Sequence, residues 1–315
     1  MKLVFFGTSE FALKPLSSLK DSKHELKAIF TQPDKKGGRN LKAIESPVKK
    51  WAFDNNYPLY QPQNILDEKA LLNQINADIF IVVGYGSKLA DEIINLPQLY
   101  SINIHPSLLP EYRGAAPVNR AIIDGKEETG VTIFKVTNKI DAGDIILQDK
   151  IRIEKQDTNL TLDKKLSQLG ARLLIEALDL IENNEVEFKP QNDASATYAP
   201  KLRKENGLID FSKPADQIFN LIRGTKGWPS AFTYLNNKIL KIHEAEIIET
   251  DGFKKDTKPG EIVKVKEGNG IIVKTHKGYL NILSLQLEGK KEMPSRQFIL
   301  GHKIEEGDIL GKYLT

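Results

Sequence analysis

The sequence predicts an α/β fold in two domains, a doubly wound N-terminal domain followed by a small antiparallel β-barrel. The length of 315 residues is the first reason, because a single hydrophobic core stops growing near roughly 250 residues. Short apolar segments alternate with amphipathic ones in the first half, which is typical of a parallel sheet covered by helices on both faces. In the last third, short segments separated by Gly, Asn and Pro turns favour antiparallel strands.

The predicted elements of the first domain begin with an apolar strand at residues 3–6. Thr8 or Ser9 follows it and can cap a helix, because either side-chain oxygen can accept a hydrogen bond from the first helical turn. Another helix is expected to begin at Ser46-Pro47-Val48, where a proline in the first turn removes only an N–H that a helix leaves unpaired. Further strands are expected at residues 26–30, 78–83 and 101–105. Such sheets place their sites at the carboxyl ends of strands, near the point where the strand order reverses.

Two later segments, residues 132–136 and 143–153, alternate apolar with polar residues and are expected to form edge or antiparallel strands. The strongest helix signal spans residues 160–181, where apolar residues recur three or four positions apart. Residues 184–205 are polar, contain two prolines and show no clear period, so a linker is expected there. The predicted division is therefore a first domain at 1–183, a linker at 184–205 and a second domain at 206–315.

The second domain is predicted to be an OB-like barrel built from short antiparallel strands. Four of its strands are expected at residues 239–243, 261–265, 270–275 and 279–285. Residues 201–315 carry 20 Lys and Arg against 15 Asp and Glu. A basic domain can be the electrostatic footprint of nucleic acid, although a solvated lysine-rich face would give the same balance. Trp228-Pro229 is interpreted as an anchor of the core of this domain rather than as a stacking platform.

Composition and missing motifs exclude several function classes. The chain has no cysteine, which excludes a disulfide framework, a thiolate nucleophile and an iron–sulfur cluster. With five histidines a multi-histidine metal site is not expected, and we predict no metal. The sequence holds no dinucleotide glycine fingerprint, phosphate-cradling loop or Gly-x-Ser-x-Gly elbow. No apolar run approaches the roughly 18 residues of a membrane span and no signal segment is evident, so a cytoplasmic protein is expected.

The segment at residues 101–117 carries the side chains best suited to catalysis. Asn103 and His105 are two positions apart, so on a strand they face the same side. A side-chain amide can stabilise negative charge that develops on a carbonyl oxygen, and an imidazole can move a proton. A turn downstream offers Asp141, whose carboxylate could orient the imidazole. Taken singly, His105 fits a hydrogen-bonded core residue equally well, and Asp141 fits an ordinary turn residue beside Gly143.

A second candidate feature is the basic loop at residues 34–42. Connections between α/β elements usually have about 2–6 residues, and longer ones often bind a ligand. The loop carries four cations, Lys35, Lys36, Arg39 and Lys42. These side chains suit contacts to phosphates, and Arg39 could also contact a base edge. A mobile surface loop would show the same composition.

These motifs together resemble the enzymes that transfer the formyl group of 10-formyltetrahydrofolate. The resemblance rests first on the signature Ser107-Leu108-Leu109-Pro110, followed by Tyr112-Arg113-Gly114 and Pro117. Asn103, His105 and Asp141 match the catalytic trio of that family. Further matches extend over nearly the whole chain and include Thr31-Gln32-Pro33-Asp34, Gly114-Ala115-Ala116-Pro117, Trp228-Pro229 and Gly289-Lys290-Lys291. The resemblance implies a Rossmann-like formyltransferase domain and an OB-like second domain.

The resemblance also implies roles for particular residues, with methionyl-initiator-tRNA as the acceptor. Asn103 would donate to the oxyanion, and His105 would move a proton with the help of Asp141. The folate co-substrate would lie in a slot lined by the backbone of Ser107, Leu108, Leu109 and Pro110. The loop with Lys35, Lys36, Arg39 and Lys42 would approach the acceptor end of the tRNA, with Arg39 as the recognition residue. Pro106 departs from the family pattern, in which a small residue is common, and would stiffen the folate loop.

Three other functions share part of this pattern. A sugar-nucleotide N-formyltransferase would use the same trio, but the basic loop and the basic second domain favour tRNA. A formyltetrahydrofolate hydrolase would be expected to carry a regulatory module before its catalytic domain, whereas here the catalytic strand is expected to begin at residue 2. A nucleic-acid-binding protein with an inactive site is disfavoured because Asn103, His105 and Asp141 occur together. A monomer would suffice for the two-domain arrangement.

Overall fold

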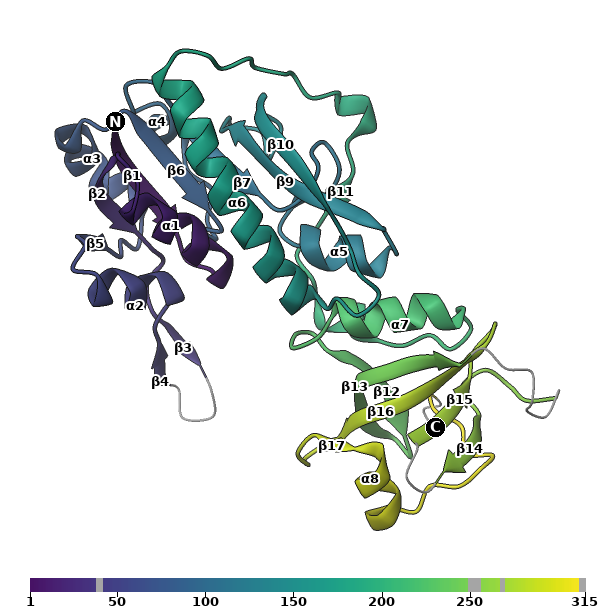
Figure 1. Ribbon diagram of the computed structural model, residues 1–315. Coiled ribbons are helices and arrows are strands. Elements are labelled where there is room, and N and C mark those ends of the chain that lie inside the picture. Colours follow the sequence, from purple (N-terminus) through teal and green to yellow (C-terminus); the bar gives the residue numbers. More distant parts are fainter. Residues whose placement is uncertain (38–41, 249–255, 267–269, 312–315) are drawn as a thin grey trace. The chain divides into compact units, whose positions relative to one another are not determined.

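The computed structural model describes residues 1–37, 42–248, 256–266 and 270–311 (Figure 1). The chain divides into two compact units, each of which is made of three stretches of sequence. The first unit comprises Met1–Pro117, Glu128–Arg152 and Leu162–Pro200, and the second comprises Val118–Glu127, Ile153–Thr161 and Lys201–Thr315. None of the described helices is both long and apolar enough to cross a membrane.

A seven-stranded mixed sheet forms the centre of the first unit, in the order β10-β9-β7-β6-β1-β2-β5 (Figure 1). Its strands are β1 (Lys2–Gly7), β2 (Glu25–Phe30), β5 (Leu59–Tyr60), β6 (Ile79–Val83), β7 (Tyr100–His105), β9 (Glu128–Lys135) and β10 (Ile145–Arg152). β9 runs antiparallel to both of its neighbours, β7 and β10, whereas the other neighbouring strands pair in parallel, so six of the seven strands share one direction. The chain builds outward from β1 to β2 and β5 and then returns to β6 on the other side of β1. The predicted doubly wound topology is confirmed, and the strand order reverses between β1 and β6.

Helices cover this sheet, and the long one was predicted within a residue of each end. They are α1 (Leu13–Lys20), α2 (Pro47–Asp54), α3 (Lys69–Ile75), α4 (Asp91–Ile94) and, from Leu162 on, α6 (Asn159–Glu182), with short 3₁₀ turns η1 (Glu10–Ala12) and η2 (Ile65–Glu68). α5 (Pro117–Ile123) belongs to the second unit from Val118 on. α6 buries its apolar stripe, whose members include Leu166, Leu173 and Ile181. α2 begins at Pro47 as predicted, and Ser46 caps it by accepting a hydrogen bond from the Lys49 N–H at 3.0 Å. Ser9 precedes η1 without a side-chain capping bond, so that predicted cap is wrong.

The core of the first unit explains why β1 is apolar throughout. Successive side chains of a strand point to opposite faces, and both Phe5 and Phe6 are fully buried, so layers cover both faces of the sheet. The Phe6 ring stacks on Phe30 and tilts against Phe80, with centroid distances of 5.1 and 5.3 Å. Burying one such side chain contributes about 1.5–3 kcal/mol relative to leaving it in water.

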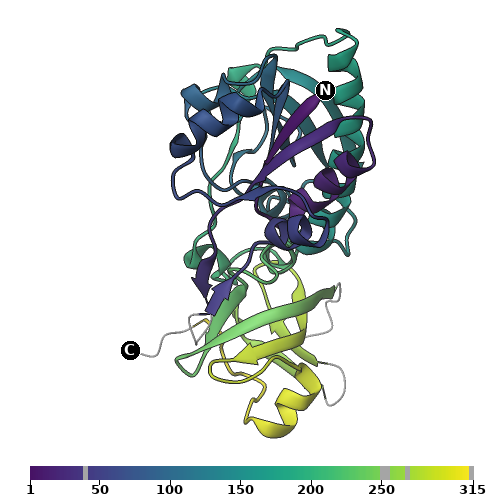
Figure 2. The same ribbon diagram turned by 90° about the vertical axis from the view of Figure 1, so that its left-hand side faces the viewer.

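The basic segment at 34–42 begins and ends as strands rather than as a loop. β3 (Lys35–Gly37) and β4 (Lys42–Ile44) pair antiparallel and extend away from the sheet of their own unit (Figure 2). Asp34 anchors the base of this hairpin, because its carboxylate accepts hydrogen bonds from Lys49 Nζ and Gln61 Nε2. The bond from Lys49 holds the pKa of the Asp34 carboxyl below its usual value. The expectation of a plain loop was wrong because three-residue strands carry too few residues to show a period.

The second unit contains an antiparallel sheet in the order β12-β13-β16-β15-β14, with β17 paired to β16. Its strands are β12 (Ala231–Leu235), β13 (Lys238–Ile248), β14 (Ile262–Lys266), β15 (Gly270–Lys274), β16 (Tyr279–Leu287) and β17 (Met293–Pro294). All four predicted strand segments fall within or overlap these elements, and the predicted antiparallel domain is confirmed. Closure of the sheet into an OB-like barrel stays a prediction.

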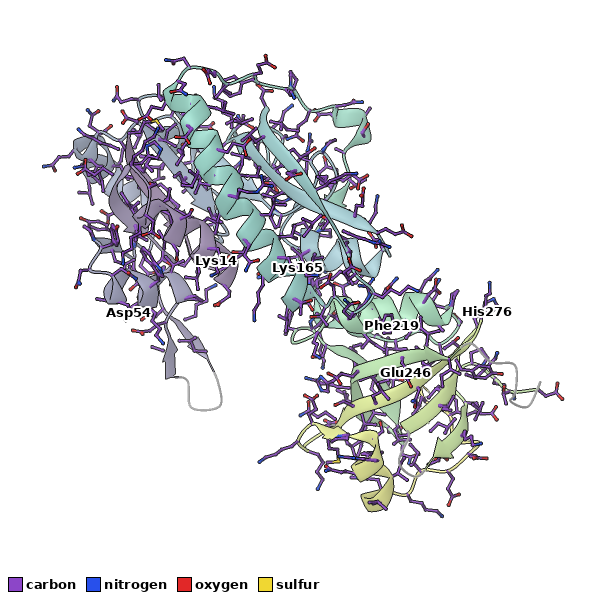
Figure 3. The ribbon with its side chains drawn as sticks, viewed as in Figure 1. Lys14, Asp54, Lys165, Phe219, Glu246 and His276 are labelled. Atoms are coloured by element: carbon purple, nitrogen blue, oxygen red, sulfur yellow. The ribbon has the colours of Figure 1, made fainter. Side chains whose placement is uncertain are left out.

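Two helices pack on this second sheet, and neither was predicted from the sequence. α7 (Ala215–Gly224) buries Ile218 and Ile222 in the core, with Phe219 at its edge (Figure 3). α8 (Ser295–Gly301) inserts the fully buried Phe298 into the same core. Trp228 does not belong to that core, since 57% of its surface is exposed. The interpretation of Trp228 as a core anchor was therefore wrong.

Candidate active site

The candidate catalytic residues lie at the carboxyl end of β7, beside the strands where the sheet order reverses. In the register of the sheet, Asn103 lies opposite Val82 of β6, and His105 lies opposite Thr132 of β9. Asn103 is half-buried and His105 is buried. Because the two residues are separated by one position on a strand, their side chains share a face, as the sequence predicted.

Both ring nitrogens of His105 face oxygen atoms of the protein. Nε2 lies 2.9 Å from the backbone oxygen of Tyr112. A carbonyl oxygen only accepts, so Nε2 carries the hydrogen of this bond. Nδ1 lies 3.7 Å from Oδ2 of Asp141, which is longer than a direct hydrogen bond. The Tyr112 carbonyl therefore fixes the orientation of the ring, and Nδ1 is directed toward the carboxylate.

Asp141 is held in place by the backbone around it. Its Oδ2 accepts a hydrogen bond of 2.8 Å from the Gly114 N–H. Its own φ is +50°, a left-handed conformation that aspartate tolerates better than most residues. Two positions on, a Cβ on Gly143 would lie 1.7 Å from the Lys135 oxygen, so only glycine lets this turn approach β9 so closely. The structure thus brings His105 and Asp141 together across 36 positions of sequence.

The predicted folate segment, Ser107 to Pro110, is held against β9 and β10 by hydrogen bonds to Thr132 and Gln148. The Thr132 hydroxyl donates to the Ser107 oxygen at 2.7 Å and accepts from the Leu109 N–H at 3.1 Å. Gln148 Nε2 donates to the Leu109 oxygen at 3.0 Å. The oxygens of Leu108 and Pro110 also accept backbone bonds, from Glu111 and Thr197. A ligand at this segment would therefore meet carbonyl oxygens that already accept one hydrogen bond each.

A neighbouring segment after β6 received no role from sequence reasoning. Gly84 and Gly86 have φ values of +53° and +88°, and Tyr85 between them is buried, which raises the pKa of its phenol. The Thr8 hydroxyl at the end of β1 donates to the Tyr85 oxygen at 2.8 Å. These residues therefore lie where β1 and β6 end and the strand order reverses. Two glycines directly after an apolar strand were the signal that could have indicated this turn.

The four cations assigned to tRNA are only partly within the described residues. Lys35 lies on β3 and is exposed. Lys36 and Lys42 lie on the paired backbones of β3 and β4. Arg39 lies outside the described residues. Their predicted contacts stay predictions.

Among the described residues, one group of side chains has the composition of a metal site, namely His24, Asp179 and Glu182. Lys23 already lies between the two carboxylates, with Nζ 2.9 Å from Asp179 and 2.7 Å from Glu182. These hydrogen bonds raise the pKa of the lysine. The acidic charge of the group is thus balanced by the chain itself, and we assign no ion to it.

Known proteins with similar sequences share one activity in their names. A family model described as formyl transferase matches residues 1–178, and one for the C-terminal domain of formyl transferases matches residues 201–303. Methionyl-tRNA formyltransferase of Sulfurihydrogenibium sp. is 43% identical over 311 residues, which are 98% of this chain and 99% of that protein. The enzyme of the same name from Alkaliphilus oremlandii is 42% identical over 314 residues, covering 99% of this chain and 100% of that protein.

Solved structures with a similar fold are more distant in sequence. HypX from Aquifex aeolicus, in complex with tetrahydrofolic acid, matches 95% of this chain and 47% of its own, with a TM-score of 0.66 and 17% identity. The N-formyltransferase from Helicobacter canadensis, in complex with folinic acid and dTDP-3-aminofucose, matches 90% of this chain and 98% of its own, with a TM-score of 0.67 and 23% identity. These likenesses concern the fold. With the two domain matches and the full-length relatives, they confirm the predicted family, and the chain belongs to the methionyl-tRNA formyltransferases.

Proposed function

We propose that this protein transfers the formyl group of 10-formyltetrahydrofolate to the amino group of methionyl-initiator-tRNA. The product, N-formylmethionyl-tRNA, would serve the initiation of translation. The observation that carries the proposal is the pairing of His105 with Asp141 beside Asn103 at the carboxyl end of β7. The full-length relatives named for this activity support the choice of acceptor.

In the proposed reaction the uncharged methionyl amine attacks the formyl carbon. The carbonyl π bond opens onto oxygen, and a tetrahedral intermediate with an oxyanion forms. Asn103 donates a hydrogen bond to this oxyanion from its half-buried amide, and such a donor lowers the barrier because the negative charge appears only as the bond forms. The intermediate then collapses by breaking the bond between the formyl carbon and the folate nitrogen.

His105 carries the proton between the two nitrogens. The amine loses one proton on attack, and the departing folate nitrogen gains one. Because Nε2 is committed to the Tyr112 oxygen at 2.9 Å, Nδ1 is the atom that exchanges the proton. Asp141 faces Nδ1 at 3.7 Å and stabilises the imidazolium that forms. The Gly114 N–H keeps the carboxylate in that position.

Two surfaces complete the proposal. The folate is bound near Ser107, Leu108, Leu109 and Pro110, and the folate ligand named for HypX supports a folate site on this fold. Lys35 and Lys36 on β3 and Lys42 on β4, together with Arg39, contact the acceptor end of the tRNA, since clustered cations suit phosphates.

The alternative is transfer to an amino sugar, because the Helicobacter canadensis structure with a similar fold contains dTDP-3-aminofucose. One experiment separates the acceptors. The protein is incubated with 10-formyltetrahydrofolate labelled on the formyl carbon, together with methionyl-tRNA, a nucleotide-linked amino sugar, or water alone. We expect label on methionyl-tRNA only. Label on the sugar, or release as formate without an acceptor, would overturn the proposed function.

A further inference from the structure

The segment at residues 191–199, expected to be part of a linker, lies along both loops that complete the active site. It contains a 3₁₀ turn (Asp193–Ser195) and the short strand β11 (Tyr198–Ala199). β11 pairs in parallel with β8 (Arg113–Gly114), which follows the predicted folate segment. We refer to residues 191–199 as the brace.

Gln191 begins the brace and uses both ends of its amide. Nε2 donates to the backbone oxygens of Asp141 and Gly143, at 3.0 and 2.8 Å. Oε1 accepts from Nε and Nη2 of Arg113, at 3.1 and 2.8 Å. A guanidinium only donates and a carbonyl only accepts, so these four bonds allow a single orientation of the amide. Gln191 thereby fixes the turn that carries the Asp141 carboxylate.

Arg113 is the fixed point to which Gln191 is tied. Its side chain is 4% exposed, and Nη2 donates to Oδ1 of Asp193 at 2.7 Å. This bond holds the pKa of the Asp193 carboxyl below its usual value. A buried guanidinium is stable only when its charge and its donors are paired. Gln191 and Asp193 together provide that pairing, so the brace and Arg113 hold each other in place.

The other end of the brace supports the partner of His105. The Thr197 hydroxyl accepts from the Tyr112 N–H at 2.8 Å, and the Thr197 oxygen accepts from the Arg113 N–H at 2.9 Å. Tyr112 has a φ of +60°, a conformation that costs a bulky residue energy and persists only when its surroundings impose it. The Tyr112 oxygen is the acceptor for His105 Nε2.

We propose that Gln191 is a positioning residue for catalysis, which sets the place of Asp141 relative to His105 and passes no proton itself. This inference rests on the proposed roles of His105 and Asp141. The same contacts would also arise if the brace only stabilised the fold. The two cases differ in kinetics, because a positioning residue affects the chemical step and acts through Asp141, whereas a stabilising residue affects neither specifically.

The test compares Gln191→Met with Asn192→Ala in the full chain. Methionine has a similar length but replaces the hydrogen-bonding amide. Asn192 is the matched control, because its side chain bonds only within the brace among the described contacts, to Ala194 N and Ser195 Oγ at 3.1 Å each. We expect Gln191→Met to lower kcat roughly 10- to 100-fold with both KM values little changed, since a displacement of about 1 Å at a catalytic group can cost about this much. Asn192→Ala removes the side-chain cap of the 3₁₀ turn but no contact to Arg113 or to the turn that carries Asp141, so kcat should stay within about twofold of the parent.

Gln191→Glu repeats the test if the methionine variant fails to fold. It keeps an acceptor for Arg113 and places an oxygen in front of the Asp141 and Gly143 carbonyls. It should therefore retain the thermal midpoint of the parent more closely and still lose kcat. Equal losses of kcat in the Gln191 variants and in Asn192→Ala would overturn the inference.

A double-variant cycle separates failure of the inference from failure of the mechanism. If Gln191 acts through Asp141, Gln191→Met should cause little further loss of kcat in an Asp141→Asn background. Losses that multiply would show that Gln191 acts independently and would overturn the inference. If Asp141→Asn alone leaves kcat unchanged, the proposed role of Asp141 is wrong. If only the Gln191 variants leave it unchanged, the positioning role is wrong.

Discussion

The hydrogen bond from His105 to the Tyr112 oxygen makes the two ring nitrogens of the histidine different. Nε2 is committed to this oxygen, and Nδ1 faces Asp141. A ring held in this way reaches the reacting atoms in one orientation, which spares the reorientation of the ring during catalysis. Asn103, the proposed oxyanion donor, is separate from this pair, so the two proposed functions can be removed one at a time.

Removing either function should lower turnover without loss of tRNA binding. Asn103→Ala removes an oxyanion donor and should lower kcat about 10²- to 10³-fold. His105→Ala removes the proposed proton carrier and should lower kcat roughly 10²- to 10⁴-fold. Single-turnover formyl transfer gives the rate, and filter binding of methionyl-tRNA gives the affinity, which should be unchanged because neither side chain is assigned a phosphate contact. Turnover within about threefold of the parent in both variants would rule out the catalytic assignment.

Asp163, near the start of α6, should make stability depend on pH. Burial, and then repulsion from Glu10, raises the pKa of its carboxyl from 3.8 to about 6. The unfolded chain therefore holds its proton less tightly than the folded one between these two values, so stability from this group is present at low pH and is lost as pH rises through about 6.

Asp163→Asn should remove this dependence. At pH 7.5 the variant should be more stable than the parent by about 1–3 kcal/mol, and near pH 4 the two should be alike. Thermal or urea unfolding at the two pH values measures the difference. A gain of the same size at both would mean that ionisation of Asp163 is not its cause.

At the scale of elements, a helix or strand could be predicted from the sequence when its hydrophobic pattern was long enough to repeat. α6 was predicted closely because its apolar stripe repeats over many turns. β3, β4, β8 and β11 were missed because two or three residues cannot show an alternation. The candidate active site was predictable in part, since Asn103 and His105 lie two positions apart on one strand. Gln191 and Thr197 were not, because their partners Asp141 and Tyr112 lie 50 and 85 positions away.

The β3–β4 segment should contribute to tRNA binding through charge. Replacing Lys35, Lys36 and Lys42 by Gln should weaken binding of cognate and non-cognate tRNA alike. It should also reduce the slope of log affinity against log salt by about 0.7–0.9 for each lost phosphate contact. Lys50→Gln, on an exposed position of α2, is the matched control. An unchanged salt slope in the triple variant would exclude these lysines as phosphate contacts.

Arg39→Ala should behave differently from the lysine variants. A guanidinium can read a base edge in a single geometry, worth roughly 1–3 kcal/mol of discrimination. The variant should lose activity on methionyl-tRNA while folate binding stays near that of the parent, as measured by fluorescence titration. Equal formyl transfer by Arg39→Ala and the parent would remove this residue from tRNA recognition.

At the scale of the whole molecule, the second unit includes two short stretches of sequence that lie between segments of the first unit. Asn119 Nδ2 donates to the Gly224 oxygen at 2.8 Å, and Asn159 Nδ2 donates to the Lys226 oxygen at 3.1 Å. Arg223 Nη1 donates to the Asp157 oxygen at 3.0 Å. Residues 118–127 and 153–161 are thus partners of residues beyond 200, within one unit.

A chain ending near residue 205 should therefore lose stability as well as tRNA affinity. The polar groups of residues 118–127 and 153–161 would lose their partners, at about 1 kcal/mol for each hydrogen bond. We expect a thermal midpoint several degrees below that of the full chain, measured by circular dichroism. A chain ending at residue 311 serves as the control. If the shorter chain melted at the same temperature as the full one, these contacts would contribute nothing to stability.

Because the second unit is made of three separate stretches of sequence, it also limits where genes of this family can be recombined. A crossover after residue 200 would take residues 201–315 from one parent. Residues 118–127 and 153–161, which pack with them in the same unit, would then come from the other parent. Working hybrids need these two short inserts from the same parent, so three separate stretches of gene must be inherited together. Divergence toward another acceptor is accordingly expected by successive substitution in an intact chain, rather than by exchange of its last third.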